Sequence, residues 1–160
     1  LGMKGSGKDE NKRAPMYWSK DKNAAGMCKG PADMEDFQMK FDSLEEQQED
    51  PDSIYNYVKQ VIRVRNQNPV IARGTTAYLE QYSGEQCFAL TRSYEGSNLL
   101  LLGNTSAEAV SVDLTGLTVG GTTAEELVLL GELYTGEETA ERAGTVVTLP
   151  AYSILILGEE

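Results

Sequence analysis

The chain has 160 residues and a mean hydropathy of −0.38, and none of its apolar runs approaches the roughly 20 residues needed to cross a bilayer. It contains no histidine, which excludes Ser–His and Cys–His nucleophile pairs and every metal site that includes histidine. The net charge is −11, and residues 74–160 carry all of it, with 2 Lys/Arg against 13 Asp/Glu. Because such an acidic surface repels nucleic acid and anionic lipid, we expect neither as a partner.

The charge balance changes sharply near Gly74. Residues 1–73 contain 12 Lys/Arg and 12 Asp/Glu, so this part of the chain is neutral. A break of this kind indicates two structural units, and we place the boundary between residues 73 and 74. For the acidic part, solubility is the simplest role of the charge.

The first part opens with a polar segment that lacks periodicity. Glycines at positions 2, 5 and 7 permit sharp turns, residues 8–13 form a charged run, and residues 15–18 (Pro-Met-Tyr-Trp) supply a bulky anchor. Functional loops have these features, but no strand precedes the segment to serve as its scaffold. The segment therefore suggests the end of a longer protein.

Two helical segments are predicted next, a short turn at 43–48 and a helix at 51–67. Asp50 would cap the longer helix and Pro51 would take its first position, where a missing N–H costs nothing. Asn68-Pro69 ends it, because a residue before proline disfavours helical torsions. Apolar side chains recur at helical spacing and form a stripe of Ile54, Val58, Val61 and Ile62.

After Gly74 the pattern is that of short strands separated by turn residues. It predicts a mainly β fold, an antiparallel β-sandwich of Greek-key type that is preceded by the irregular segment and one helix. The apolar runs 99–102, 127–130 and 154–157 suit central strands that are covered on both faces. The predicted strands span 78–82, 87–94, 98–103, 109–114, 126–130, 145–149 and 152–157.

Two other features of the chain have simple structural interpretations. Cys28 and Cys87 could pair, but a single pair at long spacing is no disulfide framework, and Cys87 also fits a small core residue of its strand. The glycosylation pattern at 104–106 falls in a turn between strands, and we interpret it as chance.

Three segments, in matching order and spacing, resemble the C-terminal third of retaining glycoside hydrolases of the α-amylase type. The first reads GM at 2–3 and DENKRAPMYW at 9–18, and it is similar to the segment after the last barrel strand of amylases and oligo-α-glucosidases. The second reads DPDS at 50–53 and VIRVRNQNP at 61–69, like their final barrel helix. The third reads LPAYSILIL at 149–157, like the Leu-Pro-x-Tyr-Ser close of their C-terminal β-domain.

The resemblance implies a parent (β/α)8 barrel with its active site at the C-terminal ends of the strands. Residues 1–73 would be the last loop and last helix of the truncated barrel, and residues 74–160 the C-terminal sandwich. Retaining hydrolysis needs two carboxyl groups about 5 Å apart, and in this family they lie in earlier motifs that no acid of this chain matches. We therefore assign no catalytic residue here. Enzymatic activity on starch or malto-oligosaccharides would belong to the parent protein, and the chain alone should not cleave a glycosidic bond.

Two side chains of the opening segment are candidate substrate-binding residues in this light. Arg13 could meet a sugar hydroxyl or an active-site carboxylate, or it could pin the loop to the barrel. Trp18, with Tyr17, could stack on a sugar ring. For both aromatic residues, an anchor buried under its own turn is the preferred interpretation.

No metal site or cofactor is expected in this chain. Asp9, Glu10 and Asp21 are dense enough to suggest calcium, but they follow no ligand spacing, and a solvated charge run is the simpler hypothesis. Calcium stays an option for the parent protein, and the family weakly favours an extracellular or cell-surface location for it.

The expected partners are the parent barrel and, for the parent, an α-glucan. Without the barrel, the stripe of Ile54, Val58, Val61 and Ile62 should pack onto the chain's own sandwich or onto a second copy. Two alternatives stay open, a free-standing carbohydrate-binding module and a structural interaction domain. A module would need exposed aromatic residues, whereas we expect packing in the core or on the sheet for Tyr78, Tyr82, Tyr94, Tyr134 and Tyr152.

Overall fold

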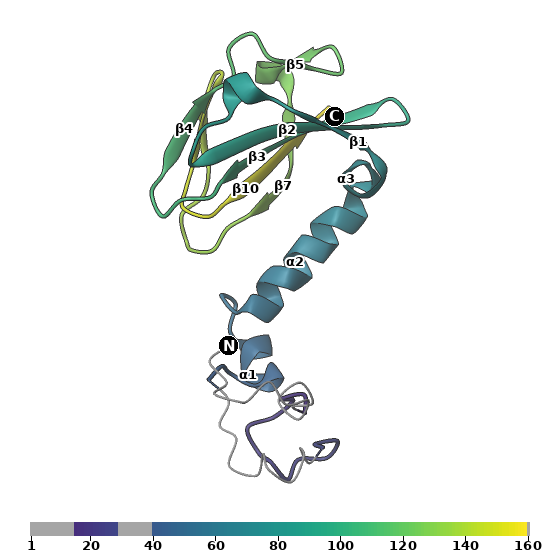
Figure 1. The fold of residues 1–160 in the computed structure, drawn as a ribbon, viewed down its shortest axis with the longest axis vertical. Coiled ribbons are helices and arrows are strands. Elements are labelled where there is room, and N and C mark those ends of the chain that lie inside the picture. The colour runs from purple at the N-terminus through teal and green to yellow at the C-terminus, as the bar shows by residue number, and fades with distance from the viewer. Residues whose placement is uncertain (1–14, 29–39, 160) are drawn as a thin grey trace, which may run out of the picture. The chain divides into compact units, whose positions relative to one another are not determined.

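The computed structural model describes residues 15–28 and 40–159 (Figure 1). The chain forms two compact units, Leu1–Asn56 and Tyr57–Glu160. Within the described residues every pair of strands is antiparallel, and the few helices precede the strands or connect them. The predicted mainly β fold with an antiparallel sandwich and a preceding helix is confirmed.

Two sheets form the body of the second unit (Figure 1). The strands are β1 Thr75–Tyr78, β2 Cys87–Tyr94, β3 Ser97–Asn104, β4 Val110–Asp113, β5 Thr118–Val119, β6 Thr122–Thr123, β7 Val128–Leu133, β8 Glu141–Ala143, β9 Val146–Leu149 and β10 Ile154–Gly158. The larger sheet has the order β1-β2-β3-β10-β7 and the smaller one β4-β9-β8, while β5 and β6 form a separate ribbon. The chain passes from one sheet to the other between β3 and β4, between β4 and β7 by way of the ribbon, between β7 and β8, and between β9 and β10, as the two layers of a sandwich require.

The main core lies between the two sheets. Leu100 and Leu102 of β3 alternate with residues of the opposite face, because successive side chains of a strand point to opposite sides. Leu155 and Leu157 of β10 do the same in the neighbouring strand. These leucines pack with buried residues that the smaller sheet and the connecting loops supply, namely Val112, Leu114, Leu117, Val119, Ala124, Leu127, Val147 and Leu149.

A second apolar cluster covers the outer face of the larger sheet. Its helical side comes from α2 (Ile54–Gln67) and from α3 (Pro69–Arg73), with Val64 and Val70 buried. The sheet contributes Leu99, Leu133 and Ile156. The central strands β3 and β10 are therefore covered on both faces, as their apolar runs predict.

The prediction for the run 127–130 was wrong. β7 contains most of this run, but it lies at the edge of the larger sheet, and Leu129 is 53% exposed. Apolar composition alone does not separate an edge strand from a central one when one face of the edge strand is still needed for the core.

The predicted strand at 78–82 also needs correction. β1 ends at Tyr78, and the chain then turns through a short 3-10 helix, Glu80–Tyr82. The turn lets the Tyr82 ring enter the core, where its hydroxyl donates to the Thr115 carbonyl at 3.1 Å. β5, β6 and β8 were not predicted, because strands of two or three residues give no periodic pattern.

The first helix, α1, spans Leu44–Glu49 and agrees with the helical turn expected at 43–48. Ser43 caps it through a capping box, in which the Ser43 hydroxyl oxygen accepts from the Glu46 N–H and the Glu46 carboxylate accepts from the Ser43 N–H. The Ser-x-x-Glu spacing at 43–46 is a sequence signature of this arrangement.

α2 begins at Ile54 and not at residue 51, so Asp50 and Pro51 do not start it. Asp50 is the C-cap of α1, and Ser53 takes the capping role, with its hydroxyl oxygen accepting from the Asn56 N–H at 3.2 Å. The side-chain amide of Asn56 donates to the carbonyls of Gln47 at 3.0 Å and Asp50 at 2.8 Å. These bonds satisfy the free carbonyls at the end of α1, which is why the chain turns before it resumes a helix.

The end of α2 at Gln67 is as predicted, but Pro69 starts a further helix instead of ending helical structure. Pro69 occupies the first turn of α3, the position where proline is tolerated. The short helix brings Val70 onto the sheet, and this burial has no counterpart in the local sequence pattern.

A buried corner joins the start of β10 to the end of β3. Asn104 is 3% exposed, and its side-chain amide donates to the carbonyls of Glu108 at 2.7 Å, Leu149 at 3.2 Å and Pro150 at 2.9 Å. The fully buried Ser153 hydroxyl donates to the Pro150 carbonyl at 2.7 Å. The residues of the LPAYS motif thus close the sandwich at this corner.

Candidate functional site

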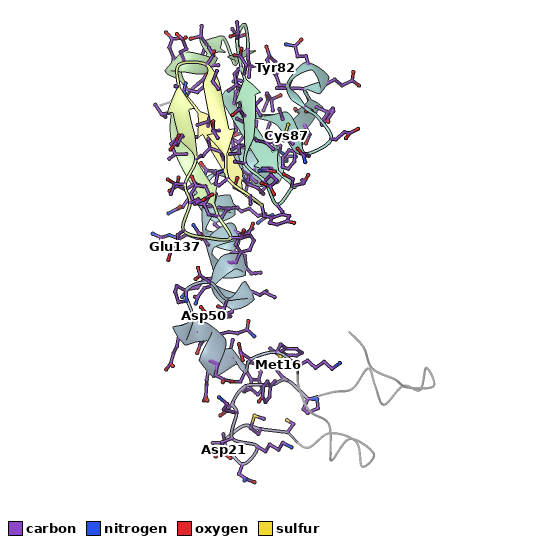
Figure 2. All side chains as sticks on the ribbon, turned by 90° about the vertical axis from the view of Figure 1, so that its left-hand side faces the viewer. Met16, Asp21, Asp50, Tyr82, Cys87 and Glu137 are labelled. Carbon is purple, nitrogen blue, oxygen red and sulfur yellow. The ribbon has the colours of Figure 1, made fainter. Side chains whose placement is uncertain are left out.

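The opening segment is described from Pro15 onward, so Arg13 lies outside the described residues. The backbone of the described part of this segment is fixed by hydrogen bonds to the first turn of α1. The carbonyls of Tyr17 and Trp18 accept from the N–H groups of Leu44 at 2.9 Å and Glu45 at 3.1 Å, which would otherwise be free at the helix start. Met16 and Asp21 lie in this segment as well (Figure 2).

The two aromatic residues of the segment have different environments. Tyr17 is half-buried and meets the Phe41 ring edge to face, with centroids 6.4 Å apart and an interplanar angle of 81°. Trp18 is 45% exposed. The expectation of a buried anchor therefore holds in part for Tyr17 and was wrong for Trp18. Phe41 was not predicted as a partner of Tyr17, and no sequence signal links the two.

An ion pair adjoins the aromatic residues along the chain. The Lys20 ammonium contacts the Glu46 carboxylate, which also accepts from the Ser43 hydroxyl at 2.8 Å. The hydrogen bond from Lys20 and those from Ser43 lower the pKa of Glu46 from 4.5 to about 2. The bond to Glu46 raises the pKa of Lys20 in return. The pair ties the opening segment to α1, and sequence reasoning did not find it because the partners are 26 positions apart.

The acidic residues of the opening segment do not form a metal site where they are described. Asp21 accepts from the Asn23 N–H at 2.9 Å and so closes a local turn. Asp9 and Glu10 lie outside the described residues. Across residues 15–28 and 40–159, no group of three or more Cys, Asp or Glu side chains could hold a metal ion.

Three described carboxyl groups have shifted pKa values, and each is shifted downward. Besides Glu46 they are Asp113, which accepts from the Thr115 hydroxyl, and Glu126, which accepts from the Thr123 hydroxyl. A general acid for glycoside cleavage needs the opposite, a raised pKa. These three carboxylates are therefore structural groups that stay ionised near neutral pH.

The apolar stripe of α2 is divided between covered and uncovered residues. Val61 packs against the outer cluster of the sandwich, together with Tyr57 and Val64. Ile54, Val58 and Ile62 are exposed, at 78%, 46% and 51%. Of the predicted stripe, Val61 packs on the sandwich, whereas the expected packing there was wrong for Ile54, Val58 and Ile62. The helix contacts the sandwich mainly through residues beside the predicted stripe.

The tyrosines of the sandwich also divide into two groups. Tyr82 is buried, and Tyr94 and Tyr134 are half-buried, as expected for core or sheet packing. Burial raises the pKa of Tyr134 to about 12, and its hydroxyl donates to the Glu132 carboxylate at 2.7 Å. Tyr78 and Tyr152 are exposed instead, so the packing prediction was wrong for them.

Both cysteines are free thiols. Cys28 is exposed, whereas Cys87 packs against the main core, in agreement with its interpretation as a core residue (Figure 2). Asn104, the acceptor position of the glycosylation pattern, is buried with its amide fully engaged, which supports the interpretation of that pattern as chance. Among the described residues, no helix has both the length and the apolar character to cross a membrane.

Comparison with known proteins places these features in a family. Residues 2–74 match the family described as alpha amylase, catalytic domain. Eubacterium rectale Amy13B shares 39% sequence identity with the chain at a TM-score of 0.84, over 100% of this chain and 30% of that one.

More distant structures have the same fold. The α-amylase from H. orenii has 24% identity and a TM-score of 0.70, over 100% of this chain and 30% of its own. The F164L mutant of MutB, from crystals soaked with trehalulose, has 24% identity and a TM-score of 0.64, over 93% of this chain and 26% of its own. The chain spans about a third of the length of these proteins or less. With the catalytic-domain match at its N-terminal end and 39% identity to Amy13B along its whole length, the chain belongs to the α-amylase family.

Proposed function

We propose that the chain is the C-terminal part of an α-amylase-type glycoside hydrolase that acts on starch or malto-oligosaccharides. The observation that carries this proposal is the 39% identity to Amy13B over the full length of the chain, which equals 30% of that protein. In the proposal, residues 1–73 are the last loop and last helix of a (β/α)8 barrel. Residues 74–160 are the sandwich that stabilises the barrel.

The exposed residues of α2 support this division of the chain. One side of the helix is covered by the sandwich through Val61 and Val64, while Ile54, Val58 and Ile62 face solvent. A helix that lies between two layers needs apolar residues on both sides. We propose that the barrel strands cover the free side, where each buried side chain would contribute about 1.5–3 kcal/mol.

The catalytic carboxyl groups would come from the part of the hydrolase that this chain does not cover. The match of residues 2–74 to the catalytic domain supports a contribution to the active-site rim. The downward pKa shifts of Glu46, Asp113 and Glu126 are the reverse of what a catalytic acid requires. The chain alone is therefore proposed to be inactive.

Expression of the chain with and without the coding sequence upstream of Leu1 tests the proposal. The longer protein should release reducing sugar from soluble starch and from maltopentaose, whereas the chain alone should release none above the buffer rate. An upstream sequence without barrel units and without paired carboxylates would contradict the proposal, as would starch cleavage by the chain alone.

A second candidate, a carbohydrate-binding sandwich, is favoured by one observation. Tyr78 is 57% exposed and Tyr152 is 51% exposed, and an exposed tyrosine ring can stack on a sugar. Retardation of the chain in a starch-containing native gel, lost in the variants Tyr78→Ala or Tyr152→Ala, would support this function. Unchanged mobility in starch would exclude it.

A further inference from the structure

The strand β1 forms one edge of the larger sheet, and all four of its residues are exposed. An edge strand presents unpaired N–H and C=O groups to which another strand can bond. Natural sheets block such an edge with lysine, proline, a bulge or a covering segment. β1 has the sequence Thr-Thr-Ala-Tyr and pairs with β2 without a register shift, so it has neither a blocking residue nor a bulge.

The pairing of β1 with β2 shows which backbone groups point to the open edge. The Leu79 N–H donates to the Ala89 carbonyl at 3.0 Å, so the ladder is bonded at this position. Bonded and non-bonded pairs alternate along an antiparallel ladder. Ala77 therefore also bonds to β2, whereas the N–H and C=O groups of Thr76 and Tyr78 point away from β2. These groups are available to a further strand.

Charge distinguishes this edge from the other three sheet edges. β7 contains Glu132, β4 contains Asp113 and β8 contains Glu141. Neither β1 nor β2 contains an acidic residue, and β2 supplies Arg92, one of the two cationic residues of the acidic part of the chain. Because like charges on neighbouring strands destabilise a sheet, two copies of this acidic domain would meet with the least local repulsion at β1.

Two β1 strands are complementary to each other when Ala77 lies on a two-fold axis between them. Thr76 of each copy then faces Tyr78 of the other, and each such pair exchanges both of its backbone hydrogen bonds. The small side chain of Ala77 suits the close, non-bonded position at the axis. The Arg92 guanidinium donates to the Thr76 hydroxyl, so the Tyr78 ring of the second copy would lie beside a cation that can contact its face.

We propose that two copies of the chain associate through β1 and join their larger sheets into one antiparallel sheet. The interface is small, because each copy contributes one strand of four residues, so the dimer is weak and depends on protein concentration. The surface is distinct from the exposed stripe of α2, and the inference does not depend on the proposed function.

Sedimentation velocity of the chain over a range of concentrations tests the proposal. The unmodified chain should dimerise reversibly, and Tyr78→Lys should weaken dimerisation at least about tenfold, because it places an ammonium group at the edge. Leu129→Lys is the matched control on β7, at the opposite edge, where the exposure is 53% against 57% for Tyr78. It should leave the dimer intact. A chain that stays monomeric up to about 1 mM, or equal dimerisation of the two lysine variants, would overturn the proposal.

Thr76→Pro is a second variant that blocks the edge and keeps the ladder to β2. The Thr76 N–H points away from β2, so proline removes a donor only from the open side of the strand. Circular dichroism should show a folded protein, and sedimentation should show loss of the dimer. Dimerisation of folded Thr76→Pro as strong as that of the unmodified chain would reject β1 as the interface.

A disulfide between copies tests the register. With Cys28→Ser and Cys87→Ala in place, Ala77→Cys should cross-link two copies in oxidised glutathione, because Cα atoms at the axis lie about 4.5 Å apart. Thr75→Cys is the control, since the same register separates the two Thr75 positions by about 14 Å. Val58→Asp on α2 should leave the Ala77→Cys cross-link unchanged. Equally fast cross-linking through Thr75→Cys, or loss of the cross-link in Val58→Asp, would contradict the proposal.

Discussion

Asn104 is the polar residue on which the closed corner of the sandwich depends. Its amide is buried and donates to three carbonyls, and a side chain without donors would remove these three bonds, although the Glu108 and Pro150 carbonyls still accept from the Ser106 and Ser153 hydroxyls. We expect Asn104→Ala to lower the free energy of unfolding by about 2–4 kcal/mol in urea denaturation. Asn98→Ala, which removes a bond to the Gly96 carbonyl and a bond from the Ser93 hydroxyl at a more exposed position, is the control and should cost about 1 kcal/mol or less. Equal costs for the two variants would show that the corner is not held by Asn104.

Glu46 should make the opening segment sensitive to acid. Its folded pKa of about 2 lies below the ordinary 4.5, so the ionised form is favoured by folding. The stabilisation is complete above pH 4.5 and is lost as the pH falls through the folded value. Trp18 fluorescence should therefore change between about pH 4.5 and 2, and this change should be absent in Glu46→Gln. Glu45→Gln, in the same helical turn, is the control and should keep the change. A transition that persists in Glu46→Gln would rule out the Lys20–Glu46 pair as its origin.

Residue-level prediction from sequence succeeded where a local rule applies. The helical turn expected at 43–48 is α1, and Cys87 alternates into an apolar strand as expected. It failed where the partner is distant in sequence. Tyr17 contacts the Phe41 ring and is half-buried, whereas Trp18 is exposed. The sequence of residues 15–18 does not show which of the two rings is the more buried. Arg13 stays a prediction.

At the scale of the element, α2 rests on the sheet at a glycine. A Cβ atom on Gly131 would come within 2.9 Å of a methyl group of Val64, which is closer than van der Waals contact. We expect Gly131→Ala to lower the free energy of unfolding by about 1–3 kcal/mol, because the helix must move away from the sheet. Gly136→Ala is a suitable control, since no atom lies within 4 Å of the added methyl group.

A double substitution can separate crowding from backbone effects at Gly131. If crowding is the cause, Val64→Ala should reduce the cost of Gly131→Ala, and the two changes should be coupled by about 0.5 kcal/mol or more. Strict additivity, measured by chemical denaturation of the four proteins in the cycle, would indicate a backbone effect and no contact between α2 and the sheet at this position.

Helices and strands were predictable to the extent that one rule governed each of them. The end of α2 and the bounds of β2 follow from Asn68-Pro69 and from the alternation of β2. The start of α2 was not predictable in this way, because Asp50-Pro51 matches the sequence pattern of a helix start. The hydrogen bonds of Ser53 and Asn56 place the actual start at Ile54. Local propensity was overridden there by side-chain bonds to the preceding helix.

At the scale of the whole molecule, the two sides of α2 should respond differently to charge. Val58→Asp places a carboxylate on an exposed side and should change the stability of the chain by no more than about 0.5 kcal/mol. Val61→Asp places the same group against the sandwich and should cost about 2–4 kcal/mol. Thermal unfolding of both variants tests this difference.

The variants Val58→Asp and Val61→Asp also test the proposed contact with the barrel and the self-association expected through the exposed stripe. In the longer protein Val58→Asp should become as damaging as Val61→Asp, and light scattering of the chain alone should show fewer dimers for Val58→Asp if copies associate through the exposed stripe. A longer protein that tolerates Val58→Asp would contradict the barrel contact, and a monomeric unmodified chain would contradict the association.

The fold class and the family resemblance were predictable because strand alternation and three separated motifs point to the same architecture. The packing of the helix on the sandwich was not, since α2 has apolar residues on more than one side and sequence periodicity cannot rank them. The composition break at Gly74 marks a change of charge, whereas the compact unit that contains the strands begins at Tyr57.

This offset matters for anyone who wishes to shorten the protein. A polypeptide cut at Gly74 would lack Val64 and Val70, and the side chains of Leu99 and Ile156 on the larger sheet would then be exposed to solvent. We expect such a truncated protein to aggregate or to bind another molecule through this apolar face. A protein that keeps residues from Pro51 onward retains α2 and α3, which cover the face.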